Sequence, residues 1–136
     1  MPILVVEDDP NDQDLIQMAL ARAGIANPIV LAHDGQEALD KLVSASAMSP
    51  LPALVLLDLK LPKVNGFEVL AQLRSHPATR YLPVVVMSSS SELEDMTRSY
   101  ENGANSYIRK PVAIKDYNEA IKSIVHYWLT LNQSAT

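Results

Sequence analysis

The chain has 136 residues, of which 48% are apolar, and its formal net charge is −5. This length allows one domain with a sizeable core, and the acidic balance argues against a general affinity for nucleic acid or an anionic membrane. The absence of cysteine excludes disulfides, thiolate metal sites and a thiol nucleophile. The first residues lack a basic segment and the apolar run there is too short for a signal peptide, so we expect a cytoplasmic protein.

Five short apolar runs, at residues 3–6, 29–32, 53–57, 84–87 and 107–109, are rich in Val, Ile and Leu. They are too short for helices and do not alternate with polar residues. This pattern is typical of strands that are covered on both faces, as in a parallel sheet. The last run is the weakest, so we expect it at an edge of the sheet.

Segments with helical spacing of apolar residues separate these runs. The first begins at Asp9-Pro10, where Asp can cap a helix and Pro suits the first helical position, and it ends near Gly24. The others are predicted over 35–45, 66–75, 91–102 and 114–131, with Ser91 and Glu94 forming a capping box at the start of the fourth. The alternation predicts an α/β fold with a doubly wound five-stranded parallel sheet. We expect one domain over 1–136, with a frayed tail at 132–136.

Polar side chains collect at the carboxyl ends of four of the predicted strands. They are Glu7, Asp8 and Asp9 after the first strand, Asp58 after the third, Ser88 after the fourth, and Lys110 before Pro111 after the fifth. Taken singly, each has an ordinary interpretation as a helix cap, a turn residue or a solvated lysine, and Asp9 before Pro10 is best explained as a cap. Because ligands of such sheets bind beyond the carboxyl ends of the strands, the joint placement predicts a site there.

The chemistry of this cluster favours a magnesium-dependent phosphoryl acceptor. Two like charges about 5 Å apart repel by roughly 3 kcal/mol at an effective dielectric near 20, so clustered carboxylates need a counter-charge. Mg²⁺ prefers oxygen ligands and would supply that charge. Lys110 and Ser88 could then contact phosphoryl oxygens, while Asp58 acts as the nucleophile that forms an aspartyl phosphate.

The sequence resembles the receiver domains of two-component response regulators over residues 3–129. The motifs that carry the resemblance are VVEDD at 5–9, LLDLKLP at 56–62 with Gly66, PVVVMS at 83–88 and YIRKP at 107–111. The resemblance implies a (βα)5 flavodoxin-like receiver fold with strand order 2-1-3-4-5. It also implies a signalling protein rather than an enzyme, one that takes a phosphoryl group from a histidine kinase and undergoes self-phosphorylation and self-dephosphorylation at Asp58.

The resemblance assigns the acceptor and metal roles residue by residue. Asp58 matches the phosphoacceptor and, together with Asp8 and the backbone carbonyl of Lys60, a ligand of Mg²⁺. Glu7 matches an acidic residue that acts on the metal through water. Lys60 and Ser90 depart from the amide and acid of chemotaxis-type receivers, so the lifetime of the phosphoryl group does not transfer.

The remaining roles concern the response to phosphorylation. Ser88 matches the switch hydroxyl, and Tyr107 the aromatic switch residue that moves inward when Ser88 is drawn to the phosphoryl group. Lys110 matches the lysine that contacts this group, and the Lys110–Pro111 bond is expected to be cis. DPND at 9–12, LKLPK at 59–63, HPATR at 76–80 and VHYWL at 125–129 are similar to the response regulators of phytochrome-type kinases, so a bacterial phytochrome is a candidate kinase.

Partner surfaces are predicted on the first and last helices. We expect no effector or DNA-binding domain beyond the fifth helix, and therefore expect output through the surface of the receiver itself. The last helix has more apolar residues than one stripe needs, which favours a homodimer over a helix that simply packs well. Its interface candidates are Tyr117, Ile121, Ile124, Val125, Trp128 and Leu129. By resemblance, Asn11, Asp14, Leu15 and Met18 of the first helix lie on the face that meets the kinase.

Other functions fit the sequence less well. A flavodoxin-like FMN binder would place phosphate against acidic Glu7-Asp8-Asp9, and a dinucleotide oxidoreductase would need a glycine motif, although the chain has only 4 Gly. An aspartate-based phosphatase would need an acid where Lys60 stands. A phosphotransfer intermediate, a phosphate sink and a pseudo-receiver that is never phosphorylated stay open as alternatives.

Overall fold

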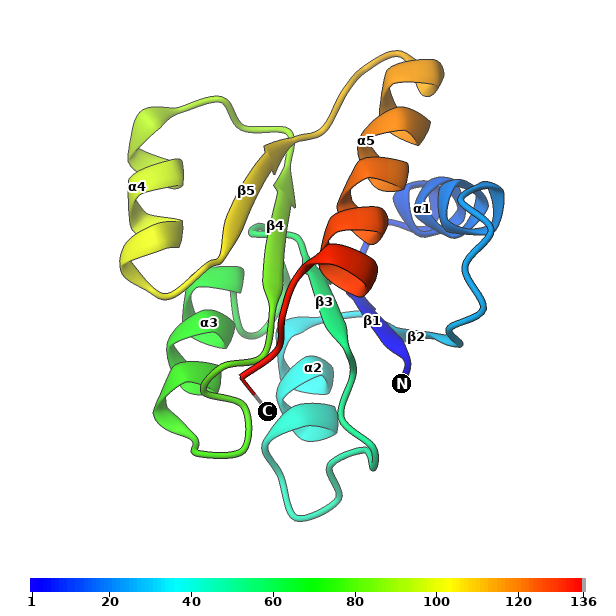
Figure 1. Ribbon diagram of the computed structural model, residues 1–136. Helices are drawn as coiled ribbons and strands as arrows, with labels where there is room; N and C mark the ends of the chain where they lie inside the picture. The colour runs from blue at the N-terminus through cyan, green and yellow to red at the C-terminus, as the bar shows by residue number, and fades with distance from the viewer. Residues whose placement is uncertain (136) are drawn as a thin grey trace.

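The computed structural model describes residues 1–135, in which five parallel strands form one sheet with helices on both faces (Figure 1). The elements in chain order are β1 (Ile3–Val6), α1 (Pro10–Arg22), β2 (Ile29–Ala32), α2 (Gly35–Leu42), β3 (Leu54–Leu57), α3 (Gly66–Ser75), β4 (Val84–Ser88), α4 (Leu93–Glu101), β5 (Ser106–Arg109), α5 (Ile114–His126) and the π-helical turn η1 (Tyr127–Leu131). The strand order is β2-β1-β3-β4-β5, which confirms the predicted fold class and places β5 at an edge. No helix in the described residues is long and apolar enough to cross a membrane.

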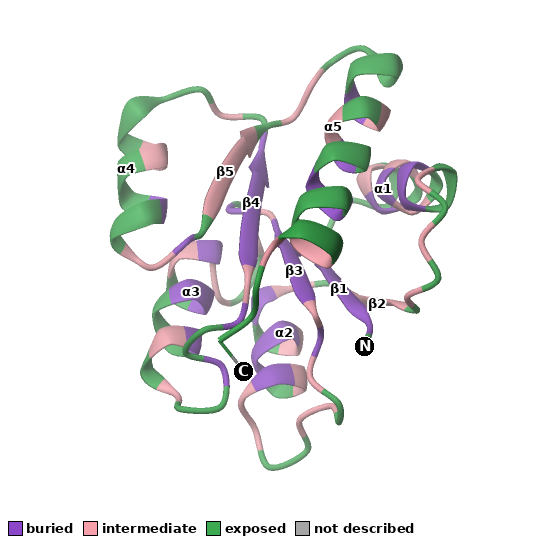
Figure 2. Ribbon diagram, in the orientation of Figure 1, coloured by how far each residue is buried: buried purple, intermediate pink, exposed green. Residues whose placement is uncertain are grey.

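Alternate residues of the central strands enter two different cores. Leu4 and Val6 of β1 pack in the core beneath α2 and α3, whereas Ile3 and Val5 pack in the core beneath α1 and α5. All four are at most 1% exposed. Figure 2 shows the central strands buried between helices that expose their outer faces. The apolar runs do not alternate because both faces of the sheet are covered.

The structure changes three of the predicted helix ends. The second helix ends at Leu42, and the fourth begins at Leu93 rather than Ser91. Its N-cap residue, Glu92, has no side-chain capping bond, so the predicted capping box is wrong. Ser90 accepts the Glu92 N–H instead, at 3.2 Å. The α-helical part of the last helix ends at His126.

The tail keeps at least one ordered contact. The Asn132 N–H donates to the carbonyl of Tyr127 at 2.7 Å. Thr136 lies outside the described residues, so fraying of the tail at 132–136 stays a prediction.

Four of the six predicted dimer-interface residues are core residues. Tyr117, Ile121, Ile124 and Val125 are between 0% and 6% exposed and belong to the core beneath α1 and α5. The apolar stripe of α5 is therefore used to cover the sheet, and these side chains are not available to a second copy. Trp128 and Leu129 are only partly buried.

Candidate functional site

Backbone hydrogen bonds bring Glu7 and Asp58 together at one edge of the sheet. Glu7 follows β1 and Asp58 follows β3, and these two strands are direct neighbours. The Asp58 N–H donates to the Val6 carbonyl at 3.1 Å, and the Glu7 N–H donates to the Ala32 carbonyl at 3.0 Å. Each ladder thus continues one residue past its strand, which fixes both side chains at the carboxyl end of the sheet.

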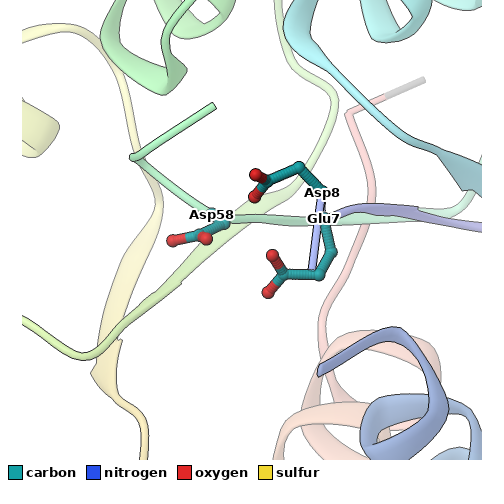
Figure 3. A group of neighbouring side chains, drawn as sticks. All are labelled: Glu7, Asp8 and Asp58. Atoms are coloured by element: carbon teal, nitrogen blue, oxygen red, sulfur yellow. The ribbon is translucent and has the colours of Figure 1, made fainter. Parts of the chain in front are cut away.

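Three carboxyl groups meet at this edge. Glu7, Asp8 and Asp58 each offer an oxygen within 4.8 Å of the others (Figure 3). Glu7 is buried, Asp58 is partly buried and Asp8 is exposed. Burial raises the pKa of Glu7 to about 7, opposed by a hydrogen bond from Lys110 and assisted by the charge of Asp58. Burial likewise raises the pKa of Asp58, opposed chiefly by Lys110.

Lys110 is the cation of this cluster. Its Nζ lies 2.7 Å from Glu7 Oε1, 3.4 Å from Asp12 Oδ2 and 3.7 Å from Asp58 Oδ2. Burial by itself would lower the pKa of Lys110, but the hydrogen bond to Glu7 and the charges of Asp58, Glu7 and Asp12 raise it above its ordinary value. Lys110 therefore stays protonated while it lies against the Asp58 carboxyl group.

The donor set fits a hard divalent cation. All three side chains offer oxygen, which Mg²⁺ and Mn²⁺ accept readily. Burial raises the pKa of Glu7 and of Asp58 although Lys110 opposes the shift, so a further cation would favour the ionised form of both groups. Glu7, Asp8 and Asp58 are thus the residues able to hold such an ion, and the carbonyl of Lys60 comes two residues after Asp58.

Close packing fixes the main chain around Asp58. The Leu59 N–H donates to Asp58 Oδ1 at 2.8 Å, which orients the carboxyl group. The first residue of α3, Gly66, lies against the same backbone: a Cβ there would lie 2.6 Å from the Asp58 carbonyl oxygen and 2.7 Å from Leu59 Cα. A larger residue at position 66 would push α3 away from Asp58 and Leu59.

The predicted switch residues lie on the adjacent strands β4 and β5, of which β5 is at the edge of the sheet. Ser88, the last residue of β4, is 1% exposed, and its Oγ accepts the Ser90 N–H at 3.2 Å. The ring of Tyr107, in β5, packs against the core, and its hydroxyl donates to the Ser90 carbonyl at 2.9 Å. The tyrosine is therefore already turned inward. The Lys110 N–H donates to the Ser88 carbonyl at 2.7 Å, which ties the ends of β4 and β5 together.

The expectation of a cis Lys110–Pro111 bond is wrong for this structure. Among the described residues the cis peptide bond is Ser49–Pro50, in the loop before β3. Lys110–Pro111 has the trans form, which X-Pro bonds prefer by roughly 0.5–1 kcal/mol.

Sequence reasoning missed two residues next to the site. Asp12 was not predicted to contact Lys110, although it lies one helical turn after the acidic run. Tyr117, assigned to a dimer interface, is buried near Lys110, Asp12 and Glu7, and burial raises the pKa of its hydroxyl to about 12. The predicted capping role of Asp9 is confirmed, because its carboxylate accepts from the N–H groups of Asn11 and Asp12.

The predicted kinase-facing residues lie on one exposed surface of α1. Asn11, Asp14 and Met18 are exposed, and Leu15 is partly buried. All four are therefore accessible to a partner in the first turns after the acidic cluster.

Known proteins share this sequence pattern and this fold. The pattern of the response regulator receiver domain matches residues 3–122. The chain is 41% identical over 133 residues to the probable methanogenesis regulatory protein FilR2 of Methanothrix harundinacea, covering 97% of this chain and 86% of that protein. It is 37% identical over 129 residues to the response regulator Rcp1 of a Synechocystis species, covering 93% and 88%.

Solved structures agree with the sequence comparison. The phosphorylated cyanobacterial phytochrome response regulator RcpA superposes with a TM-score of 0.91 at 37% identity, covering 99% of this chain and 98% of RcpA. The Mn²⁺-bound form of Rcp1 gives a TM-score of 0.87 at 35% identity, covering 98% of each chain. With its acidic cluster, its five-stranded parallel sheet and these matches, the chain belongs to the response regulator receiver domain family and is related to phytochrome response regulators.

Proposed function

We propose that this protein is a response regulator that accepts a phosphoryl group from a histidine kinase on Asp58. The observation that carries the proposal is the geometry of one carboxyl group. Asp58 lies beside two further carboxylates and 3.7 Å from a lysine that stays charged. A carboxylate in such surroundings is a nucleophile held ready for an anionic substrate, and most of the catalysis would come from positioning and charge compensation.

The transfer requires little covalent chemistry from the chain. An Asp58 oxygen attacks phosphorus, the P–N bond of the phosphohistidine breaks, and its electron pair returns to the imidazole nitrogen. Lys110 moves from Glu7 toward the arriving phosphoryl oxygens, and the Ser88 hydroxyl donates to another of them. A Mg²⁺ ion held by Asp8, Asp58, the Lys60 carbonyl and, through water, Glu7 would neutralise charge on the phosphoryl oxygens. Attack of water at phosphorus later restores the Asp58 carboxylate and releases phosphate.

The partners follow from the same proposal. The exposed face of α1 with Asn11, Asp14 and Met18 would receive the kinase, and the similarity to phytochrome response regulators favours a phytochrome-type kinase in the cytoplasm. The phosphorylated protein would signal through its own surface. A homodimer remains part of the proposal, but it would use the partly exposed Trp128 and Leu129 with their exposed neighbours Tyr127 and Leu131.

Intact-mass analysis tests the acceptor. Wild-type protein incubated with Mg²⁺ and a small phosphodonor such as acetyl phosphate should gain one phosphoryl group, and the Asp58→Asn variant should gain none. Asp8→Asn should react more slowly and should need more Mg²⁺, whereas Asp9→Asn, at a helix cap, should react like the wild type.

The alternatives predict different outcomes. Wild-type protein that gains no mass with any of several donors would identify a pseudo-receiver and overturn the proposal. Phosphorylation of Asp58→Asn to the wild-type extent would mean that another residue is the acceptor.

A further inference from the structure

Ser90, in the loop between β4 and α4, forms hydrogen bonds with four residues: Ser88, Tyr107, Asp95 and Glu92. Its N–H donates to Ser88 Oγ at 3.2 Å, and its carbonyl accepts from the Tyr107 hydroxyl at 2.9 Å. Its own hydroxyl donates to Asp95 Oδ2 at 2.6 Å. The first two partners are the proposed switch residues, and the third lies in the first turn of α4. Ser90 therefore contacts both the proposed switch residues and the first turn of α4.

The contact with Asp95 matters because α4 is weakly anchored. Ser99 is the one buried residue in this helix, and Figure 2 shows most of its surface exposed. Toward its carboxyl end, Arg98 lies 4.1 Å from the centre of the Phe67 ring. At its start no side chain of Glu92 caps the helix, and the Glu92 N–H donates instead to Ser90 Oγ. A hydroxyl–carboxylate bond is among the stronger hydrogen bonds, so Ser90 and Asp95 fix the start of the helix.

We propose that Ser90 and Asp95 are positioning residues that pass the phosphorylation signal from Ser88 to the start of α4. The inference rests on the proposed function, in which the Ser88 hydroxyl turns toward a phosphoryl group on Asp58. That rotation removes the acceptor of the Ser90 N–H, so the Ser90 backbone is left with Tyr107 alone. The loop then shifts, and the bond between Ser90 and Asp95 moves the first turn of α4 with it.

The movement of the first turn of α4 would alter an exposed surface to which a partner can bind. Leu93, the first residue of α4, is 74% exposed and lies directly after the loop. A weakly packed helix of this kind responds to small changes in its end contacts, because few buried apolar contacts hold it in place. The pair therefore converts a local change at Ser88 into a change of the accessible surface at α4.

Hydrogen exchange of the α4 amides, with and without phosphorylation, tests the relay. In the wild type, exchange of the amides at 93–99 should change by about tenfold on phosphorylation, the size of an ordinary coupling between two sites. Ser90→Ala and Asp95→Ala should reduce the ratio of exchange rates with and without phosphorylation to less than about twofold, when each variant is compared with the wild type at the same phosphorylated fraction. Ser90→Thr keeps a hydroxyl and Asp95→Asn keeps an acceptor oxygen, so both should preserve the ratio. Ser91→Ala, an exposed neighbour, is the matched control and should behave like the wild type.

The ratio of exchange rates with and without phosphorylation distinguishes residues that transmit the signal from residues that only stabilise α4. Residues that merely stabilised α4 would, when replaced, speed exchange in both states and leave the ratio unchanged. Phosphorylated Ser90→Ala protein with the wild-type ratio would therefore overturn the relay alone. Wild-type protein that takes up no phosphoryl group would overturn the proposed function together with it.

Discussion

Two partly buried cations at opposite ends of the sheet have different kinds of partners. Lys110, at the carboxyl end, lies against the carboxyl groups of Glu7, Asp12 and Asp58. Arg74, in the last turn of α3 near the amino end, donates five hydrogen bonds to neutral oxygens. These belong to the carbonyls of Gly103, Thr79, Arg80 and Leu82 and to the side chain of Asn105, at 2.8 to 3.1 Å.

The two cations differ in how freely they can change partners: Lys110 can exchange one partner for another, whereas Arg74 is held in one geometry. A lysine ammonium is a compact charge on a flexible stem, and all three of its partners here are carboxyl groups, so it can exchange one carboxyl oxygen for another anionic oxygen. The planar guanidinium of Arg74 instead joins the loop before β4 to the turn before β5 in one geometry. Burial lowers the pKa of Arg74, and its hydrogen-bond acceptors within residues 1–135 include no carboxylate. Lys110 should therefore matter for chemistry and Arg74 for stability.

The largest expected effect is on phosphorylation. Lys110→Ala should slow phosphorylation of Asp58 by about 100-fold or more, because a positioned group that stabilises developing charge is removed. The measurement is the rate of mass gain with a small phosphodonor and Mg²⁺. Lys63→Ala is the control: Lys63 is 69% exposed and its ion pair with Asp34 is 3.4 Å long, so the rate should stay within about twofold. A loss of similar size in both variants would contradict the assigned role.

The second effect is on stability. Arg74→Ala should lower the free energy of unfolding by about 3 kcal/mol, because several carbonyls lose a charged donor at once. Arg74→Lys should recover little, since one ammonium cannot span the five acceptors. Urea denaturation measures both. Arg80→Ala, an exposed neighbour, should cost about 0.5 kcal/mol or less. The Arg74→Ala variant should be phosphorylated at the wild-type rate, unlike Lys110→Ala. A slow rate would contradict the assignment of Arg74 to stability alone.

The smallest expected effect is a pH dependence at the carboxyl end. The pKa of Glu7 is about 7 in the folded protein and 4.5 ordinarily, so between these values the folded state holds a proton that the unfolded state has lost. Without divalent metal, the free energy of unfolding should therefore fall as pH rises from about 4.5 to 7, by about 1 to 3 kcal/mol. Urea titrations across this range measure the slope. Added Mg²⁺ should restore stability more at pH 8 than at pH 5.

A substitution at Glu7 isolates that contribution. Glu7→Gln does not titrate, so its free energy of unfolding should change less between pH 4.5 and 7 than that of the wild type. An unchanged slope would assign the dependence to other groups.

Most of the fold could be predicted because buried strands leave a strong signal. The runs at 3–6 and 29–32 match β1 and β2 residue for residue, since nearly every side chain in β1 is covered. The cluster of Glu7, Asp8 and Asp58 was predictable for a topological reason. The carboxyl ends of neighbouring parallel strands must lie together, whatever the loops do.

The predictions that were wrong or missing concern contacts that a residue pattern does not specify, such as what packs against an apolar helix face. The apolar stripe with Tyr117 and Ile121 has the same sequence pattern whether it packs against a sheet or against a second copy of the chain. In the structure it belongs to the core. The role of Arg74 was not predicted, because four of its five acceptors are main-chain carbonyls of loops and turns, whose positions residue types do not specify. The bond between Ser90 and Asp95 depends on a loop conformation that residue types alone do not encode.

The two cores on either side of the sheet have an evolutionary consequence. Because Leu4 and Val6 face one set of helices while Ile3 and Val5 face the other, the helices on each face share few side-chain contacts with those on the opposite face. Changes in α4 and its neighbours need not be matched by changes in α1, since distant sites contribute almost independently. A lineage can thus acquire a new downstream partner on one face and keep the proposed kinase-binding face on the other, while the residues at the strand ends between them stay the same.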